Sequence, residues 1–290
     1  MSQAAALYDR PPSTIGCMER YVIRGGREGY DRLRVLAAAR RASTLELFQL
    51  AGLRPGMRSA DLGCGSGDVT LDMAVLAGPA GWVAGIDADQ AKLELAREAA
   101  RQRGLANVVF EVADVGHWAA PGEYDFVYCR FLLQHLARPA DLLRRMWEAV
   151  RPGGVLAVED ADLGGLFCDP DNAGFTFYQR MYVEVLARNG GDPTCARRLA
   201  RYFRQTGIPA PEVRLLQGVN AGGDAKAMPL LTLEAIADSI VRSGLATAGE
   251  VTAATEDLRA FTTRPDTLIS DPRIFQVWAR RGPDDAAAGP

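Results

Sequence analysis

Short apolar runs and amphipathic segments alternate along residues 57–160. The apolar runs predict strands near 57–61, 82–86, 108–112, 124–129 and 154–159. Helical spacing of apolar residues predicts helices near 66–77, 88–103 and 139–150, and Pro139 suits the first turn of the last one. Strands and helices in alternation predict an α/β fold with a parallel sheet and right-handed crossovers.

A glycine-rich turn joins the first strand to the first of these helices. The segment Asp61-Leu62-Gly63-Cys64-Gly65-Ser66-Gly67 has glycine at alternate positions. Because glycine has no Cβ atom, a flat ligand can approach the main chain here. Asp87 ends the next strand, twenty residues after Gly67, where a carboxylate can accept hydrogen bonds from both hydroxyls of a ribose. The pattern predicts a nucleoside site at this turn.

The charges beside the turn favour one kind of nucleoside. A dinucleotide-binding turn needs its third glycine where this chain has Asp68, and a pyrophosphate would lie between Asp68 and Asp61. Two carboxylates repel a dianion. They attract S-adenosylmethionine, which carries an ammonium and a sulfonium group.

At these residues the chain resembles the class I S-adenosylmethionine-dependent methyltransferases. Asp61 to Gly67 matches the first motif of that family, and Gly85-Ile86-Asp87 matches the second. Segments 111–114, 124–130 and 151–156 match the motifs that follow, in the family's order. The resemblance covers roughly residues 45–160. It implies a doubly wound, mostly parallel sheet of seven strands, a Rossmann-like fold, with S-adenosylmethionine as the cofactor.

The resemblance also assigns residues to the cofactor. The expected binding residues in the core are Asp61, Gly63, Cys64, Gly65, Gly67, Asp87, Ala88, Ala113, Asp114, Val115, Cys129 and Arg130. Asp114 is expected to accept a hydrogen bond from the adenine amino group, although a helix N-cap or an Asx turn would also explain it. An N-terminal lid would add Tyr21, Gly26 and Arg32, with the guanidinium of Arg32 on the methionine carboxylate. A plain loop at Gly26 and a solvated helix face at Arg32 are the alternatives.

Segments outside the resemblance complete the predicted domain organisation. Residues 1–52 form a lid segment and a helix, 53–162 the cofactor-binding core, 163–210 a helical cap inserted after the fifth strand, and 211–281 the C-terminal completion of the sheet. If the family topology holds, the last strand, Arg273 to Arg280, runs antiparallel between strands five and six. The tail, residues 282–290, has too little apolar surface to order itself, so we expect disorder there.

Methyl transfer from a sulfonium is a direct displacement, which requires alignment and, for hydroxyl and many amine acceptors, a base. His135 is the first candidate, because an unperturbed imidazole titrates near pH 6.5. Glu159 and Asp162, at and beyond the end of the fifth strand, are the second. The alternatives are that His135 makes only a local hydrogen bond and that these acids cap a helix or face water.

Aromatic side chains indicate where an acceptor would bind. Tyr178 and Tyr182 lie one helical turn apart in the predicted cap, and Trp118 follows the third strand. Core packing would explain such residues as well. As pocket residues, they predict a small apolar or aromatic acceptor, such as an intermediate of specialised metabolism or antibiotic biosynthesis.

Composition limits the remaining possibilities. The 290 residues include 33 basic and 36 acidic side chains, for a net charge of -3, and no basic tract interrupts them, so a nucleic-acid substrate is disfavoured. Five scattered cysteines and two histidines form no metal-ligand pattern, so we expect no metal. No apolar run free of charges approaches the length of a membrane span. We expect a cytoplasmic protein with no membrane partner that acts on a small molecule, with a homodimer possible.

The predicted function is transfer of a methyl group from S-adenosylmethionine to oxygen, nitrogen or carbon of a small metabolite. Three alternatives stay open at this point. An NAD-linked oxidoreductase would share the sheet but is opposed by Asp68 and by the order of the motifs. A non-catalytic binding protein, or an enzyme that uses the cofactor for another reaction, would share the cofactor site.

Overall fold

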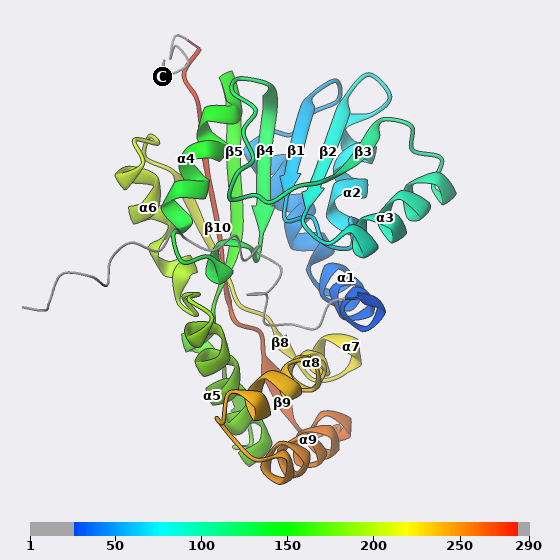
Figure 1. Ribbon diagram of the computed structural model, residues 1–290, viewed down its shortest axis with the longest axis vertical. Coiled ribbons are helices and arrows are strands. Elements are labelled where there is room, and N and C mark those ends of the chain that lie inside the picture. The colour runs from blue at the N-terminus through cyan, green and yellow to red at the C-terminus, as the bar shows by residue number, and fades with distance from the viewer. Residues whose placement is uncertain (1–25, 284–290) are drawn as a thin grey trace, which may run out of the picture.

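The computed structural model describes residues 26–283, with side chains from residue 32 onward. Its centre is a seven-stranded sheet with the strand order β3-β2-β1-β4-β5-β10-β7 (Figure 1). The strands are β1 (Arg58–Leu62), β2 (Trp82–Asp87), β3 (Val108–Val112), β4 (Tyr124–Arg130), β5 (Val150–Asp162), β7 (Glu212–Leu216) and β10 (Arg273–Arg280). Strands β1 to β5 pair in parallel, and β10 runs antiparallel between β5 and β7. The predicted doubly wound, mostly parallel fold is confirmed.

Helices cover both faces of this sheet. On one face lie α4 (Pro139–Ala149) and α6 (Leu199–Gln205), and on the other lie α1 (Gly26–Ala51), α2 (Asp68–Ala77) and α3 (Gln90–Gln102). Strand β4 is buried on both sides because its successive side chains alternate between these two cores. Its Cys129 packs on the α4 side, whereas Tyr128 packs against Phe48 of α1, with ring centroids 4.9 Å apart.

A separate group of helices lies beyond the carboxyl ends of the parallel strands, in the lower part of Figure 1. These helices are α5 (Ala173–Arg188), α8 (Met228–Arg242) and α9 (Ala248–Thr263), and their apolar faces form a core of their own. We call these three helices the cap. The predicted cap, 163–210, differs from it in two ways: α8 and α9 belong to the cap, and α6 packs instead against the sheet and α4, through Leu199 and Phe203.

Short elements complete the described chain. They are the 3₁₀ turns η2 (Leu133–His135), η3 (Leu163–Gly165) and η4 (Cys195–Arg198), the helix α7 (Gly223–Lys226), and a small sheet of β6 (Cys168–Asp169), β9 (Leu268–Ser270) and β8 (Val219–Asn220). The small sheet holds the segment before α5 against the segment before β10. Within residues 26–283, no helix combines the length and the apolar character that crossing a membrane requires.

Helix α1 contacts both the sheet and the cap. Its 26 residues span about 39 Å at the usual rise per residue. Near its start, the Arg32 guanidinium donates hydrogen bonds to the Thr232 hydroxyl of α8, at 3.0 and 3.2 Å. In its second half, the Thr44 hydroxyl donates to the Glu159 carboxylate of β5, at 2.9 Å. The predicted N-terminal helix is therefore one wall of the space between sheet and cap.

Candidate active site

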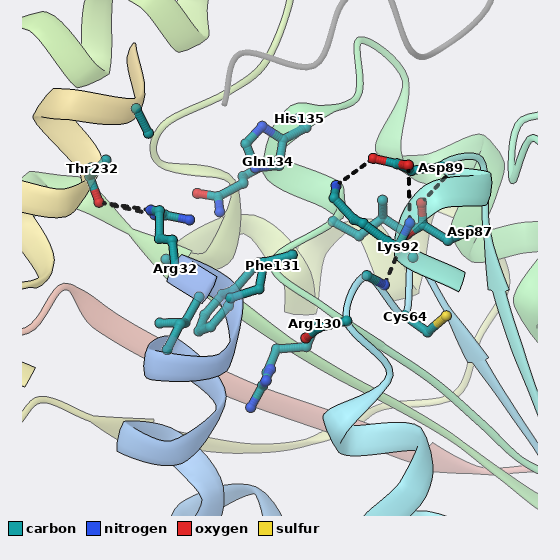
Figure 2. Close-up of a pocket in the computed structure, with 18 of the residues that line it drawn as sticks. Arg32, Cys64, Asp87, Asp89, Lys92, Arg130, Phe131, Gln134, His135 and Thr232 are labelled. Carbon is teal, nitrogen blue, oxygen red and sulfur yellow. Dashed lines mark hydrogen bonds and ion pairs between the residues drawn. The ribbon is translucent and has the colours of Figure 1, made fainter. Parts of the chain in front are cut away.

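A cavity of about 440 Å³ lies where the carboxyl ends of the parallel strands meet α1 and the cap. Its walls come from the glycine-rich turn, the segments that follow β2, β3 and β4, helix α1, and the cap helices α5 and α8. Figure 2 shows part of its lining side chains. The position agrees with the rule that ligands of open parallel sheets bind at the carboxyl ends of the strands, and the volume suits a small molecule.

The glycine-rich turn presents bare backbone to this cavity. Gly63, Cys64 and Gly65 line it, and both glycines have positive φ, +69° and +54°. A Cβ atom on Gly63 would lie 3.0 Å from the Leu132 side chain, and one on Gly65 would lie 3.1 Å from Leu33. These two glycines keep the turn open to a ligand, as the sequence predicted.

Gly67 has a packing role in this structure. It is not among the residues that line the cavity, and a Cβ atom there would lie 2.7 Å from the Cβ of Ala96. Because Gly67 is the N-cap of α2 and has φ at +76°, its bare backbone lets this turn pack closely against α3. Its assignment to the cofactor stays a prediction.

Asp87 is held rigidly at the edge of the cavity. Its Oδ2 accepts a hydrogen bond from the backbone N–H of Gly65, and its Oδ1 accepts from that of Asp89, both at 2.9 Å. Each oxygen keeps a further lone pair for a ligand hydroxyl. Ala88 lines the cavity beside it, as does Lys92, which is buried and paired with Asp89 at 3.3 Å (Figure 2). Sequence reasoning missed Lys92, although its position three residues after the Asp89 N-cap places it in the first turn of α3.

Opposite charges meet beneath the turn, at Asp61 and Arg130. The buried Asp61 carboxylate accepts a hydrogen bond from the Thr70 hydroxyl at 2.7 Å. Burial raises the pKa of Asp61 to about 7, although Thr70 and the positive charge of Arg130 act in the opposite direction. Arg130 lines the same cavity and donates to the Thr44 hydroxyl at 3.1 Å.

Together, these groups fit S-adenosylmethionine. The bare backbone accepts the body of the nucleoside, Asp87 suits its ribose, and the pair of Asp61 and Arg130 suits the ammonium and carboxylate of an amino acid. Burial raises the pKa of the Cys64 thiol, so this cavity residue stays a neutral thiol.

The segment after β3 fits the prediction only in part. Ala113 and Val115 line the cavity, as expected. Asp114 does not, because its Oδ1 accepts from the backbone N–H of Gly116 at 2.8 Å and its Oδ2 lies 3.2 Å from Nδ1 of His117. This is the Asx turn that was the alternative explanation. The Cys129 side chain is likewise absent from the cavity, since it points into the core under α4.

His135 is the one predicted base that lines the cavity. Burial, together with the nearby positive charges of Arg32 and Lys92, lowers its pKa to about 4. The imidazole is therefore neutral near pH 7 and is a weaker base there than an unperturbed histidine.

The two predicted acids make structural contacts outside the cavity. Glu159 is fully buried under α1, where it accepts hydrogen bonds from Thr44 and, at 3.1 Å, from the Tyr128 hydroxyl. Asp162 accepts two hydrogen bonds from the Arg197 guanidinium, at 2.6 and 2.9 Å, and one from the Gly164 N–H that caps η3. Neither carboxylate lines the cavity, so both base assignments are corrected. The capping alternative holds for Asp162.

The cap contributes the aromatic wall of the cavity. Tyr178 and Tyr182 of α5 both line it, with their rings stacked at a centroid distance of 6.0 Å. Trp118 does not line it, because it packs in the core against Tyr124, with ring centroids 6.0 Å apart. Its assignment to the substrate is corrected.

Two residues after β4 that line the cavity were not identified from the sequence. Phe131 has φ at +52°, a conformation that aromatic residues rarely adopt, and its N–H donates to the Glu159 carbonyl oxygen at 2.9 Å. Gln134 is buried, lines the cavity, and leaves its Oε1 without a hydrogen-bond partner. Their position just after a parallel strand was the available signal.

One of the three residues predicted for the lid, Arg32, lines the cavity. Tyr21 lies outside the described residues, and Gly26 begins α1. Arg32 lines the cavity, but its guanidinium is turned toward Thr232 of α8 (Figure 2). In the part of the chain that the structure describes, no three His, Cys, Asp or Glu side chains are placed to hold a metal ion.

Comparison with known proteins finds methyltransferases. Residues 53–187 match a family model described as a methyltransferase domain. The chain is 38% identical over 129 residues to trans-aconitate 2-methyltransferase of Deinococcus radiodurans, which covers 44% of this chain and 47% of that protein. It is 36% identical over 113 residues to a ubiquinone/menaquinone biosynthesis C-methyltransferase of Ectopseudomonas mendocina, which covers 38% of this chain and 44% of the relative.

A solved structure shares the fold. Phosphoethanolamine N-methyltransferase 2 of Haemonchus contortus, in complex with phosphomonomethylethanolamine and S-adenosylhomocysteine, superposes with a TM-score of 0.54 at 17% identity, over 83% of this chain and 52% of that one. The chain spans about half the length of the curated relatives that it matches.

Proposed function

Since this chain belongs to the class I methyltransferases, whose cofactor is S-adenosylmethionine, we propose that it transfers a methyl group from that cofactor to a small, partly apolar or aromatic acceptor. Specialised metabolism is the setting that we propose for the acceptor.

One observation carries the proposal. A single cavity joins the glycine-rich turn and Asp87 on one side to Tyr178 and Tyr182 of the cap on the other. A cofactor seated on the turn would therefore face a second space with aromatic walls. Transfer between two bound molecules needs this arrangement, because the donor and the acceptor must lie in line with water excluded.

The cofactor, when bound, supplies a methyl group activated by the positive charge of its sulfur. The chain's own residues bind and orient. Asp87 accepts the ribose hydroxyls, Asp61 attracts the ammonium group, and Arg130 binds the carboxylate of the amino-acid end. The Phe131 ring lies against the Arg130 guanidinium, with 5.5 Å between the guanidinium carbon and the ring centroid. This packing restrains the arginine at the cofactor's end of the cavity.

The cavity has fewer candidate bases than the sequence predicted. His135 is the candidate base that lines the cavity, and its lowered pKa makes it a weak one. We therefore propose an acceptor atom that needs no strong base: a nucleophile that is already anionic, a neutral amine, or an electron-rich carbon.

Calorimetry with S-adenosylhomocysteine tests the cofactor site. We expect binding by the wild type and a loss of affinity of about 10- to 100-fold in Asp87→Asn. The amide nitrogen would face one of the two backbone N–H groups that now donate to the carboxylate, and the ribose would lose one of its two acceptor oxygens. Glu94→Gln is the matched control, since Glu94 lies on an exposed position of the adjoining α3 and bonds to Gln90.

Two results would refute the proposal. Tight binding of NADH without binding of S-adenosylhomocysteine would assign the fold to an oxidoreductase. Binding of S-adenosylmethionine with no formation of S-adenosylhomocysteine across a panel of phenols, amines, indoles and carboxylic acids would leave a binding protein.

A further inference from the structure

We propose that the acceptor carries a carboxylate, which Arg32 and Gln134 bind at the end of the cavity beneath the cap. This inference rests on the proposed function, because it names the class of molecule that shares the cavity with the cofactor. It concerns binding of the acceptor and leaves open which of its atoms receives the methyl group.

The first observation is the environment of Arg32. Its guanidinium is buried, with the residue 8% exposed, and lines the cavity. Among the side chains of residues 32–283, its hydrogen-bond partner is the neutral hydroxyl of Thr232, and no carboxylate forms an ion pair with it. A buried cation is costly unless a charge of opposite sign pairs with it. The cavity beside it is where an anionic ligand would supply that charge.

The second observation is that the other cations around the cavity already have partners in the fold. Lys92 pairs with Asp89, and Arg40 pairs with Asp271. Arg242 donates to the Asp238 carbonyl oxygen and to Ser239 on its own helix. Of the two buried basic residues that line the cavity, Lys92 has a carboxylate partner, whereas Arg32 has none among the side chains of residues 32–283.

The cofactor already has a cation of its own at the other end of the cavity. Arg130 and Asp61 line the cavity there, and the charge of Arg130 lowers the pKa of Asp61, so the ammonium and carboxylate of one amino acid would find a group of opposite charge each. Figure 2 shows Arg32 on the α8 side, across the cavity from Asp87 and Lys92, with Phe131 between Arg32 and Arg130. Arg32 therefore lies where it would bind the acceptor and not the cofactor.

The third observation is the buried amide of Gln134. It is 3% exposed, lines the cavity, and its Oε1 has no hydrogen-bond partner. In Figure 2 its side chain points toward Arg32. A primary amide has donors and an acceptor, so it would donate to the same carboxylate and accept from a hydroxyl or amine beside it. The unpartnered atom is the acceptor Oε1, so it indicates a hydroxyl or amine on the ligand that donates to it, beside the carboxylate that the amide nitrogen would bind.

The walls around this end suit the rest of such a molecule. Tyr178 and Tyr182 supply stacked aromatic faces, and His135 stays uncharged beside them. A ring would pack on the tyrosines while its carboxylate reaches Arg32, which binds both oxygens in the planar geometry that a guanidinium favours. The ligand class is therefore a small aromatic carboxylate.

Binding of matched probes to the protein saturated with S-adenosylhomocysteine tests this inference. The probes are 4-hydroxybenzoate and indole-3-acetate, each against its own primary amide. We expect the carboxylate of at least one pair to bind about 10-fold or more tightly than its amide, as a charge-assisted pair requires. Arg32→Gln should abolish that preference, Arg32→Lys should keep part of it, and Gln134→Leu should weaken it.

The controls separate this inference from the proposed function. Arg34→Gln changes an exposed arginine of the same helix outside the cavity and should keep the full preference. The affinity of Arg32→Gln for S-adenosylhomocysteine should stay within about threefold of the wild type, because Arg130 binds the cofactor's carboxylate. Equal binding of acids and amides, or no binding of either, would overturn the inference alone. A loss of cofactor affinity in Arg32→Gln would overturn it by moving Arg32 to the methionine carboxylate. No cofactor binding by the wild type would overturn both proposals.

Discussion

Asp61 is a buried acid whose charge depends on what occupies the cavity. In the free protein, burial raises its pKa to about 7, so a large fraction of the carboxyl is protonated below neutral pH. An ammonium group beside it would favour the ionised form. Binding of the cofactor would then require Asp61 to lose its proton, which couples affinity to pH.

We expect S-adenosylhomocysteine to bind more tightly as the pH rises from 5 to 7, by up to tenfold per pH unit, and to reach a plateau above about pH 7.5. Calorimetry in buffers with different ionisation enthalpies should detect release of about 0.9 proton at pH 6, the protonated fraction of a group with a pKa of about 7.

Asp61→Asn should lose this pH dependence. Asp160→Asn is the matched control, because burial also raises the pKa of Asp160 to about 7, while this carboxyl bonds to the backbone of Ala161 and Gln134 and does not line the cavity. A pH dependence that persists in Asp61→Asn and disappears in Asp160→Asn would contradict the role given to Asp61.

Asp162 shows why a residue's place in the sequence does not reveal its partner. The sequence predicts that it follows the fifth strand, near the edge where a catalytic acid would lie, and in the structure it is the last residue of β5. Its carboxylate instead binds Arg197, which enters from a segment 35 residues away. No local pattern predicts such a contact. Gln134 differs, since its position after a parallel strand is the one sequence signal, and the structure adds its buried, unpartnered oxygen.

We expect Asp162→Asn to lower the free energy of unfolding by about 2 kcal/mol, because a buried carboxylate loses two charge-assisted bonds to a half-exposed arginine. Affinity for S-adenosylhomocysteine should hardly change. Asp266→Asn is the control: it breaks a pair of the same two-bond geometry with Arg264 at the surface, and urea unfolding should register little change. Equal losses of unfolding free energy in the two variants would show that burial of the ion pair does not determine how much its removal destabilises the protein.

At the scale of helices and strands, local pattern predicted most of the sheet and less of what surrounds it. The glycine-rich turn, the parallel strands and the antiparallel position of β10 follow from apolar runs and from the family resemblance. Helix α6 was predicted as an element but assigned to the cap, because helical spacing shows that one face is buried and not what it packs against. The strands β6 and β8 have two residues each, which is too short to show the alternation of apolar and polar residues that predicts a strand.

Alanine substitutions at two glycines compare a glycine needed for helix packing with one needed only for its turn conformation. Gly67→Ala should destabilise the protein by about 3 kcal/mol or more, since it combines a positive φ with a Cβ atom 2.7 Å from that of Ala96. Gly104→Ala should cost about 1 to 2 kcal/mol, because that glycine has φ at +66° but open space around its Cβ position. Thermal unfolding of both variants measures the difference. Equal losses would mean that α2 and α3 can separate without cost.

At the scale of the whole molecule, α1 sets the distance between the sheet and the cap. Its contacts with the sheet include Thr44 with Glu159 and the Gln276 amide with the Ser43 carbonyl oxygen, and its contacts with the cap and its neighbouring loop include Arg32 with Thr232 and Arg40 with Asp271. The cavity lies between these two sets of contacts. Its shape therefore depends on a helix that lies outside the residues matching the family model.

Thr44 links this helix to both the core and the cofactor's end of the cavity, because its hydroxyl donates to Glu159 and accepts from Arg130. Thr44→Val keeps the shape of the side chain but leaves Glu159, whose Oε1 has no partner, with Tyr128 as its remaining hydroxyl donor. We expect a loss of about 1 to 3 kcal/mol in unfolding free energy and a weaker affinity for S-adenosylhomocysteine, since Arg130 loses its hydrogen bond to α1, although it keeps its packing on Phe131. Ser43→Ala removes a neighbouring hydroxyl that bonds within α1 to the Arg40 carbonyl oxygen, and it should change neither quantity. A Thr44→Val protein that unfolds earlier but binds unchanged would show that Arg130 keeps its position without α1. The helix would then stabilise the fold without shaping the site.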